Sequence, residues 1–233
     1  MTSNLKRTLG GMLTLAVVFS AAEARAQKLE KPGAAPAPDT SAAAAAPSGP
    51  AGFGDAGQLT ISAERLFGFT YTHQSFGTAP AATGTTFSLL SNPFGDTSSA
   101  YGWPRVGFDY FAAKSFSLGG SASFYRSSSA GVGTTGFEVI PRLGYATMVG
   151  PWLGIWARGG VTYNHASGNS RTLQYLGLTL EGDLAFVVSP RLVVLFGPAL
   201  DIGLWGTFKA GAAASESAKL TDIGGYFGLA IPI

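Results

Sequence analysis

The sequence contains no cysteine and carries very little charge. Only 12% of its 233 residues are charged, whereas an average soluble domain has roughly 25%. The absence of cysteine excludes disulfides, thiolate catalysis and cysteine-ligated zinc or iron–sulfur sites. The low charge leaves too few ionised side chains to cover an ordinary water-exposed surface. A net charge of +2 also argues against a nucleic-acid partner.

The chain also lacks a long apolar run beyond its amino terminus, so membrane residence would have to come from strands rather than helices. At the amino terminus, Lys6 and Arg7 precede the apolar residues 9–22, and Ala24-Arg25-Ala26 places small residues where a signal peptidase cuts. We therefore predict a signal peptide over residues 1–26 rather than a membrane anchor. Residues 27–56 are rich in alanine and proline without periodicity, which predicts a disordered periplasmic leader.

What the sequence does have is glycine, at 33 positions, and strict alternation of apolar and polar residues. The pattern is clearest in residues 173–208, read as two strands that meet at Ser189-Pro190-Arg191. Leucines such as Leu178 and Leu180 share one face, while Thr179 and Glu181 share the other. Long antiparallel strands with leucine on one face and carboxylates on the other are typical of a barrel in lipid.

The same alternation predicts eight strands in residues 57–233: 57–72, 105–113, 116–125, 136–148, 152–164, the two strands of 173–208, and 220–233. Short turns near 114, 150 and 190 alternate with longer connections over 73–104, 126–135, 165–171 and 209–219. The predicted fold is all-β, an eight-stranded antiparallel up-and-down transmembrane β-barrel. Because short turns of such barrels face the periplasm, both ends of the barrel domain should be periplasmic and the long loops extracellular.

Two further features follow from the direction of each side chain. Aromatic residues on the outer face near the long loops predict an interfacial girdle of Tyr71, Phe124, Phe137, Tyr163 and Phe208. A soluble lipocalin-like barrel is the alternative, but its apolar residues point inward and its charges outward. Arg65 breaks the pattern by falling on the lipid face, where it would cost about 2–4 kcal/mol at the midplane. Either it snorkels to an interface or a bulge shifts the strand.

The predicted interior is charged. Its candidate site residues form a lumen charge network of Glu64, Arg105, Asp109, Glu138, Arg142, Arg158, Glu181, Asp183, Asp201 and Asp222. An eight-stranded barrel is only wide enough for side chains to fill it, so we expect these charges to pair and hydrogen-bond with one another; in the small outer-membrane barrels that the chain resembles, such a network plugs the lumen. A narrow passage for small solutes is the alternative. Glu181 and Asp183 are two apart on one face, a spacing that could serve metal binding or acid catalysis. We favour a structural salt network and predict no metal or cofactor.

The chain has only two histidines, His73 and His165, each predicted where a strand meets a long loop. His165-Ala166-Ser167 resembles the histidine-x-serine pair of the outer-membrane lipid A deacylases, whose catalytic site also needs an acid on the lipid-facing side. The nearest acid here, Glu181, is predicted to face inward, and Gly168 stands where that family has asparagine. We therefore predict that the protein is not an enzyme and keep a lipid-modifying activity as an alternative.

Residues 57–233 resemble the small eight-stranded outer-membrane barrels of the outer-membrane protein A, X and W groups. The most specific motif is the carboxyl end, residues 226–233, which resembles the assembly signal of spaced apolar residues and a hydrophobic terminus, here Ile233. The resemblance implies residence in the bacterial outer membrane, with membrane lipid, lipopolysaccharide and the assembly machinery as partners. It implies a structural or surface-interaction role through the extracellular loops, whose ligand the sequence does not identify.

Overall fold

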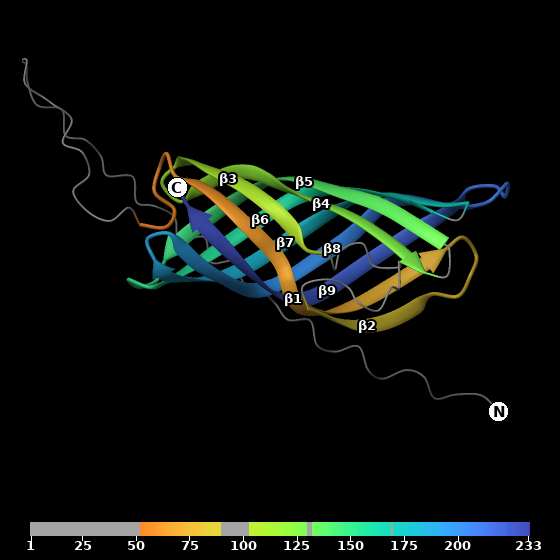
Figure 1. The fold of residues 1–233 in the computed structure, drawn as a ribbon, viewed down its shortest axis with the longest axis horizontal. Coiled ribbons are helices and arrows are strands. Elements are labelled where there is room, and N and C mark those ends of the chain that lie inside the picture. Colours follow the sequence, from red (N-terminus) through yellow and green to blue (C-terminus); the bar gives the residue numbers. More distant parts are fainter. Residues whose placement is uncertain (1–51, 90–102, 130–131, 169) are drawn as a thin grey trace, which may run out of the picture. The chain divides into compact units, whose positions relative to one another are not determined.

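The computed structural model describes residues 52–89, 103–129, 132–168 and 170–233, and every regular element among them is a β-strand (Figure 1). The predicted signal peptide and leader up to residue 51 lie outside these residues. None of the described residues form a helix long and apolar enough to cross a membrane. The strands are β1 (Leu59–Phe76), β2 (Ala82–Leu89), β3 (Arg105–Ala113), β4 (Phe116–Ser129), β5 (Val132–Met148), β6 (Leu153–Gly168), β7 (Arg171–Ser189), β8 (Leu192–Ala210) and β9 (Glu216–Pro232).

The strands form a closed antiparallel barrel. Neighbours in sequence from β3 to β9 pair with one another, β1 pairs with β3, and β1 also pairs with β9, which closes a ring of eight strands. Closure pairs the main chain all around the ring, as a strand structure in hydrocarbon requires. The predicted eight-stranded up-and-down barrel is therefore confirmed. Its strands run several residues further toward the long loops than the apolar pattern alone indicated.

Side chains alternate between the two faces of the wall as predicted. On β7, Leu180 is 51% exposed on the outer face, whereas Thr179 is buried inside. The outer face carries most of the exposed large apolar side chains, and the buried charged residues point inward. This is the reverse of a soluble lipocalin-like barrel, so that alternative is wrong.

The predicted loop 73–104 contains two pieces of regular structure, which is a correction. β1 continues to Phe76, and residues 82–89 turn back as β2, paired with β1 from Phe67↔Leu89 to Gln74↔Ala82. On that side of β1, β3 pairs only with the amino-terminal part of the strand, from Leu59↔Tyr110 to Glu64↔Arg105. The signal was weak because β2 has only 8 residues and half of them are threonine or glycine. The remainder of the loop, 90–102, lies outside the described residues.

Bulges in β1 and β8 redirect side chains that alternation had placed on the other face. Ala63 pairs with Leu229 and Phe67 with Phe227, so three residues of β1 lie opposite Gly228 alone. Arg65, at the bulge, has a φ of 54° and points inward, so the bulge explanation holds and snorkelling is wrong. A shift in β8 between Ile202 and Thr207 places Trp205 outside and turns Phe208 toward Phe76, so Phe208 does not belong to the aromatic girdle.

The lipid-facing surface of β7 gives a direct test of this side-chain alternation. We expect Leu180→Arg to lose about 2–4 kcal/mol of folding free energy in vesicles, because a guanidinium in mid-membrane must be desolvated. Val188→Arg, on the same face but at the end of the strand, should lose about 0–1 kcal/mol because its charge reaches the interface. Folding is measured by urea titration in lipid vesicles. Equal losses in the two variants would show that Leu180 does not face hydrocarbon.

Candidate functional site

The inside of the barrel holds a large group of buried charged side chains among the described residues. All ten residues of the predicted lumen charge network point inward, and Arg65 joins them through the bulge in β1. Ion pairs connect side chains from β1, β3, β5, β6, β7 and β8, so the network spans the barrel instead of following one hairpin.

Glu64 is one centre of the network. Its carboxylate accepts hydrogen bonds from Arg142 at 2.6 Å, Arg158 at 2.5 Å and Arg105 at 3.1 Å. Gly107 leaves room for this arrangement, because a Cβ there would lie 2.6 Å from Nη2 of Arg142. Three guanidiniums around one carboxylate compensate its burial by charge-assisted hydrogen bonds.

Glu181 is the second centre. Its carboxylate is 3.1 Å from Arg158 and 3.3 Å from Arg65, and it also pairs with Arg105. Arg142 lies 3.6 Å away. Glu181 and Glu64 therefore share three of the same arginines. Because the same arginines contact both carboxylates, removing one carboxylate would leave these arginines with uncompensated positive charge.

The remaining acids surround these centres. Asp109 pairs with Arg142 at 2.5 Å, Asp183 with Arg158 at 2.6 Å and Asp201 with Arg65 at 2.9 Å. Asp201 also accepts a hydrogen bond from Thr179 at 2.5 Å. Asp222 is buried opposite Asp201 in the pairing of β8 and β9. Both residues of the suggested Glu181–Asp183 pair are thus held by arginines.

Glu138 lies at the margin of the network. Its carboxylate is 3.6 Å from Arg105 but accepts no hydrogen bond from a described residue, and Asn164, its partner in the β5–β6 pairing, also has an unbonded side-chain amide. Buried polar atoms of this kind are usually satisfied by ordered water. Ordered water is therefore expected beside these two residues.

Little space remains between the charged side chains. A cavity lined by Glu64, Arg65, Arg158, Glu181 and Asp183 among others has a volume of about 10 Å³. Such a volume holds about one water molecule. The guanidiniums of Arg65 and Arg158 also lie over aromatic rings, 4.5 Å from the Tyr226 centroid and 4.4 Å from that of Trp156. Around these residues, the described side chains leave room for little more than that water molecule.

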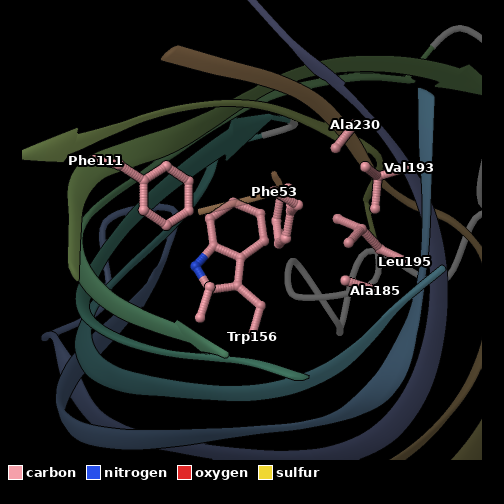
Figure 2. Close-up of a cluster of buried hydrophobic side chains, with 8 residues drawn as sticks. Phe53, Phe111, Trp156, Ala185, Val193, Leu195 and Ala230 are labelled. Carbon is pink, nitrogen blue, oxygen red and sulfur yellow. The ribbon is translucent and has the colours of Figure 1, made fainter. Parts of the chain in front are cut away.

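Beside the charges, toward the short turns, lies an apolar cluster that the sequence analysis missed. We call it the floor; it consists of Phe53, Phe111, Ala146, Trp156, Ala185, Val193, Leu195 and Ala230, all buried. Figure 2 shows the rings of Phe53, Phe111 and Trp156 together inside the barrel, with Val193, Leu195 and Ala230 across from them. The signal was present in the inward positions of β8, where Val193 and Leu195 alternate with outward residues.

Phe53 belongs to a segment that the sequence analysis placed in the disordered leader. Its ring lies 5.3 Å from Trp156 and 5.7 Å from Phe111, edge to face in both cases. The adjacent Gly54 fixes this position, since its carbonyl accepts a hydrogen bond from Ser115 N at 2.8 Å and its N–H donates to Gln58 Oε1 at 2.9 Å. Gly54 has a φ of 92°, which a residue with a side chain rarely adopts. Phe53, Gly54 and Gln58 are therefore part of the barrel's interior packing.

His165 lies on the outer face, as predicted, because its neighbours Asn164 and Ala166 are buried inside. Its Nδ1 is 3.1 Å from Nε2 of Gln174, and its ring lies 5.6 Å from that of Phe137. Glu181 points inward, as predicted, and is held by the arginines. Among the described residues, no group of three or more histidine or acidic side chains is placed to hold a metal ion. The lipid A deacylase resemblance therefore lacks its acid in this part of the chain.

Comparisons with known proteins bear on the fold. No family model matches the sequence, and no curated protein matches it. Among solved structures, the outer membrane protein AlkL in DMPC lipid bilayers matches with a TM-score of 0.52 at 10% identity, over 81% of this chain and 95% of that chain. Neisserial surface protein A matches with a TM-score of 0.47 at 11% identity, over 75% of this chain and 98% of that chain. OprG from Pseudomonas aeruginosa matches with a TM-score of 0.43 at 13% identity, over 77% of this chain and 97% of that chain.

Proposed function

Because this chain has the fold of the small eight-stranded outer-membrane β-barrels, we propose that it is a non-enzymatic integral protein of the bacterial outer membrane. Its barrel serves as a closed scaffold, and its function is structural or lies in surface interactions made by the loops. The short turns face the periplasm and the long loops face the exterior. The carboxyl-terminal strand β9, with its outward Ile223 and Ile231, is the segment that the assembly machinery reads.

The filled lumen is the observation that carries this proposal. A pore needs a continuous polar path, but here a solute would have to displace the ion pairs of Glu64 and Glu181 and then the rings of the floor. The cavity between them has room for about one water molecule. These features support a closed scaffold over the alternative of a narrow channel for small solutes.

The alternative of a lipid-modifying enzyme has less support. His165 is on the correct, lipid-facing side, but its polar contact is the amide of Gln174 rather than a carboxylate. A histidine serving as general base is usually oriented by a carboxylate, which also stabilises its charged form. The arrangement favours a non-catalytic His165 that lies at the level of the lipid headgroups.

Single-channel recording tests the proposal directly. We expect the refolded full-length protein to show conductance near zero in planar bilayers, because ions cannot pass the charge network and the floor. A general-diffusion porin reconstituted in the same lipid is the positive control. Reproducible conductance steps whose ion selectivity changes in Arg142→Gln would refute the closed scaffold and favour the channel.

A further inference from the structure

We propose that Ser123, Glu138 and Asn164, inward side chains on β4, β5 and β6, bind a calcium ion through their oxygen atoms. We call this group the oxygen row. The strand pairing places Ser123 opposite Glu138, and Glu138 opposite Asn164. Directly opposite residues on neighbouring strands have Cβ atoms about 4.5–5.5 Å apart, so each neighbour can share an ion with the central Glu138. Spacing within one strand does not reveal this group, which is why the sequence analysis predicted no metal.

The polar atoms of the oxygen row are buried and unbonded. The exposed fraction is 7% for Ser123, 1% for Glu138 and 0% for Asn164. The Ser123 hydroxyl, both carboxylate oxygens of Glu138 and both amide atoms of Asn164 form no hydrogen bond with a described residue. The amide of Asn164 could donate to the carboxylate opposite it, yet the two groups stay apart. Because buried polar atoms need partners, this arrangement indicates a ligand between them.

The charge of the lumen favours a cation over water alone as that ligand. The lumen charge network together with Arg65 contains seven buried carboxylates and four buried guanidiniums among the described residues, an excess of three negative charges. A buried charge without compensation is strongly unfavourable. Water can satisfy the hydrogen bonds of a buried carboxylate but leaves the excess charge in place. A cation bound to oxygen atoms does both.

The compensation is weakest at Glu138. Its ion-pair partner Arg105 is 3.6 Å away. Arg105 also donates a hydrogen bond of 3.1 Å to Glu64 and pairs with Glu181, so its charge is shared among three carboxylates. Asp183, by contrast, lies 2.6 Å from a guanidinium. A further cation would therefore stabilise the lumen most where it contacts Glu138.

The ligand atoms indicate the class of cation. Carboxylate, amide and hydroxyl oxygens suit hard ions such as Ca²⁺ and Mg²⁺. Ca²⁺ accepts about six to eight oxygens in irregular geometry, whereas Mg²⁺ requires a near-ideal octahedron and keeps most of its water. A row of oxygens along a curved wall supplies one side of a coordination sphere, which favours Ca²⁺ with water on the other side. With a single carboxylate, we expect a dissociation constant of roughly 0.1–1 mM, as in extracellular calcium modules.

The ion would enter from the long-loop end. On β5, Glu138 lies nearer that end than Arg142 does, and the floor fills the barrel on the other side of the network. The exterior is then the source of the ion, a step that rests on the proposed orientation in the outer membrane. Next to the row, Tyr125 lies against Gly136, where a Cβ would collide with its ring, and the ring of Trp103 stacks on it at 4.5 Å.

The test is calcium binding by the refolded full-length protein in neutral detergent, measured by calorimetry after metal has been removed with EDTA. We expect Glu138→Gln to weaken binding at least about tenfold, because it removes the only carboxylate of the oxygen row. If that variant fails to fold, Asn164→Ala takes its place, with an expected loss of about fivefold for one neutral ligand. Glu216→Gln is the matched control, since it removes the same charge from an exposed position. An equal loss in the control would overturn the site.

Terbium luminescence locates the ion. Tb³⁺ replaces Ca²⁺ at oxygen sites and emits when a neighbouring aromatic ring transfers energy to it. We expect Trp103→Phe to lower this emission and leave calcium affinity unchanged, while Trp205→Phe, on the outer face, lowers neither. Emission that depends on Trp205 instead of Trp103 would place the ion elsewhere and refute the proposal.

A wild-type protein that binds no calcium at about ten times the expected dissociation constant would mean that water alone fills the oxygen row. That result would also overturn the proposal. Conductance in planar bilayers would refute the closed scaffold, but calcium binding in detergent does not depend on it. The two proposals therefore fail separately.

Discussion

Glu64→Gln should lower the free energy of unfolding by about 3–5 kcal/mol, because it removes one centre of the lumen charge network and leaves buried charges uncompensated. The substitution keeps the side-chain volume but takes away the negative charge that Arg105, Arg142 and Arg158 share. It also places an amide N–H group beside the guanidinium N–H donors of these arginines. The measurement is urea-induced unfolding in lipid vesicles, with intrinsic fluorescence as the readout.

Glu216→Gln is the control for this experiment, since Glu216 is exposed at the long-loop end and should change stability by less than about 0.5 kcal/mol. A double-mutant cycle with Arg142→Gln sharpens the test. In a closely packed network the two substitutions should be strongly non-additive. A Glu64→Gln loss below about 1 kcal/mol, together with new conductance, would mean that water rather than arginine satisfies Glu64.

Phe53→Ala should cost about 3–5 kcal/mol, the usual range for a buried phenylalanine, because it empties the centre of the floor. Trp156 reports on the same event, since the ring of Phe53 covers it edge to face. With Trp103, Trp152 and Trp205 replaced by phenylalanine, we expect the emission of Trp156 to move to longer wavelength and its quenching by iodide to increase. Conductance should remain near zero, because the charge network still fills the barrel.

Phe124→Ala is the matched control for Phe53→Ala. Phe124 is 72% exposed on the outer face, so its removal should leave the emission of Trp156 unchanged. If Phe53→Ala fails to insert, Phe53→Leu keeps most of the volume and should shift the emission less. Unchanged Trp156 emission in a folded Phe53→Ala barrel would mean that residues 52–58 do not close the short-turn end.

Several features could be read from the sequence because they follow from local rules. A strand in a lipid-facing barrel must alternate, so Leu180 outward and Thr179 inward were predictable from their spacing alone. Tight turns fixed the ends of neighbouring strands, and β3 begins and ends at the predicted residues. The inward positions of all ten charged residues follow from the same period of two. The closed ring then follows, since open edges are not tolerated in hydrocarbon.

Other features depend on contacts between distant residues, and only the tertiary structure decided them. Arg65 turns inward because a bulge opposite Gly228 reverses its direction, which alternation within β1 cannot reveal. The partners in the network are set by the width of the closed barrel, as in the pairing of Glu64 with Arg158 across the lumen.

The composition of the floor also depends on contacts between distant residues. Phe53 sits in an alanine- and proline-rich region with no periodicity, and it becomes a core residue only because closure leaves a space beside Phe111 and Trp156. The sequence by itself determined the wall of this barrel, because the requirement that apolar side chains face lipid acts on each strand independently. What fills the barrel was decided by its closure, because packing and ion pairing depend on which side chains the ring brings face to face.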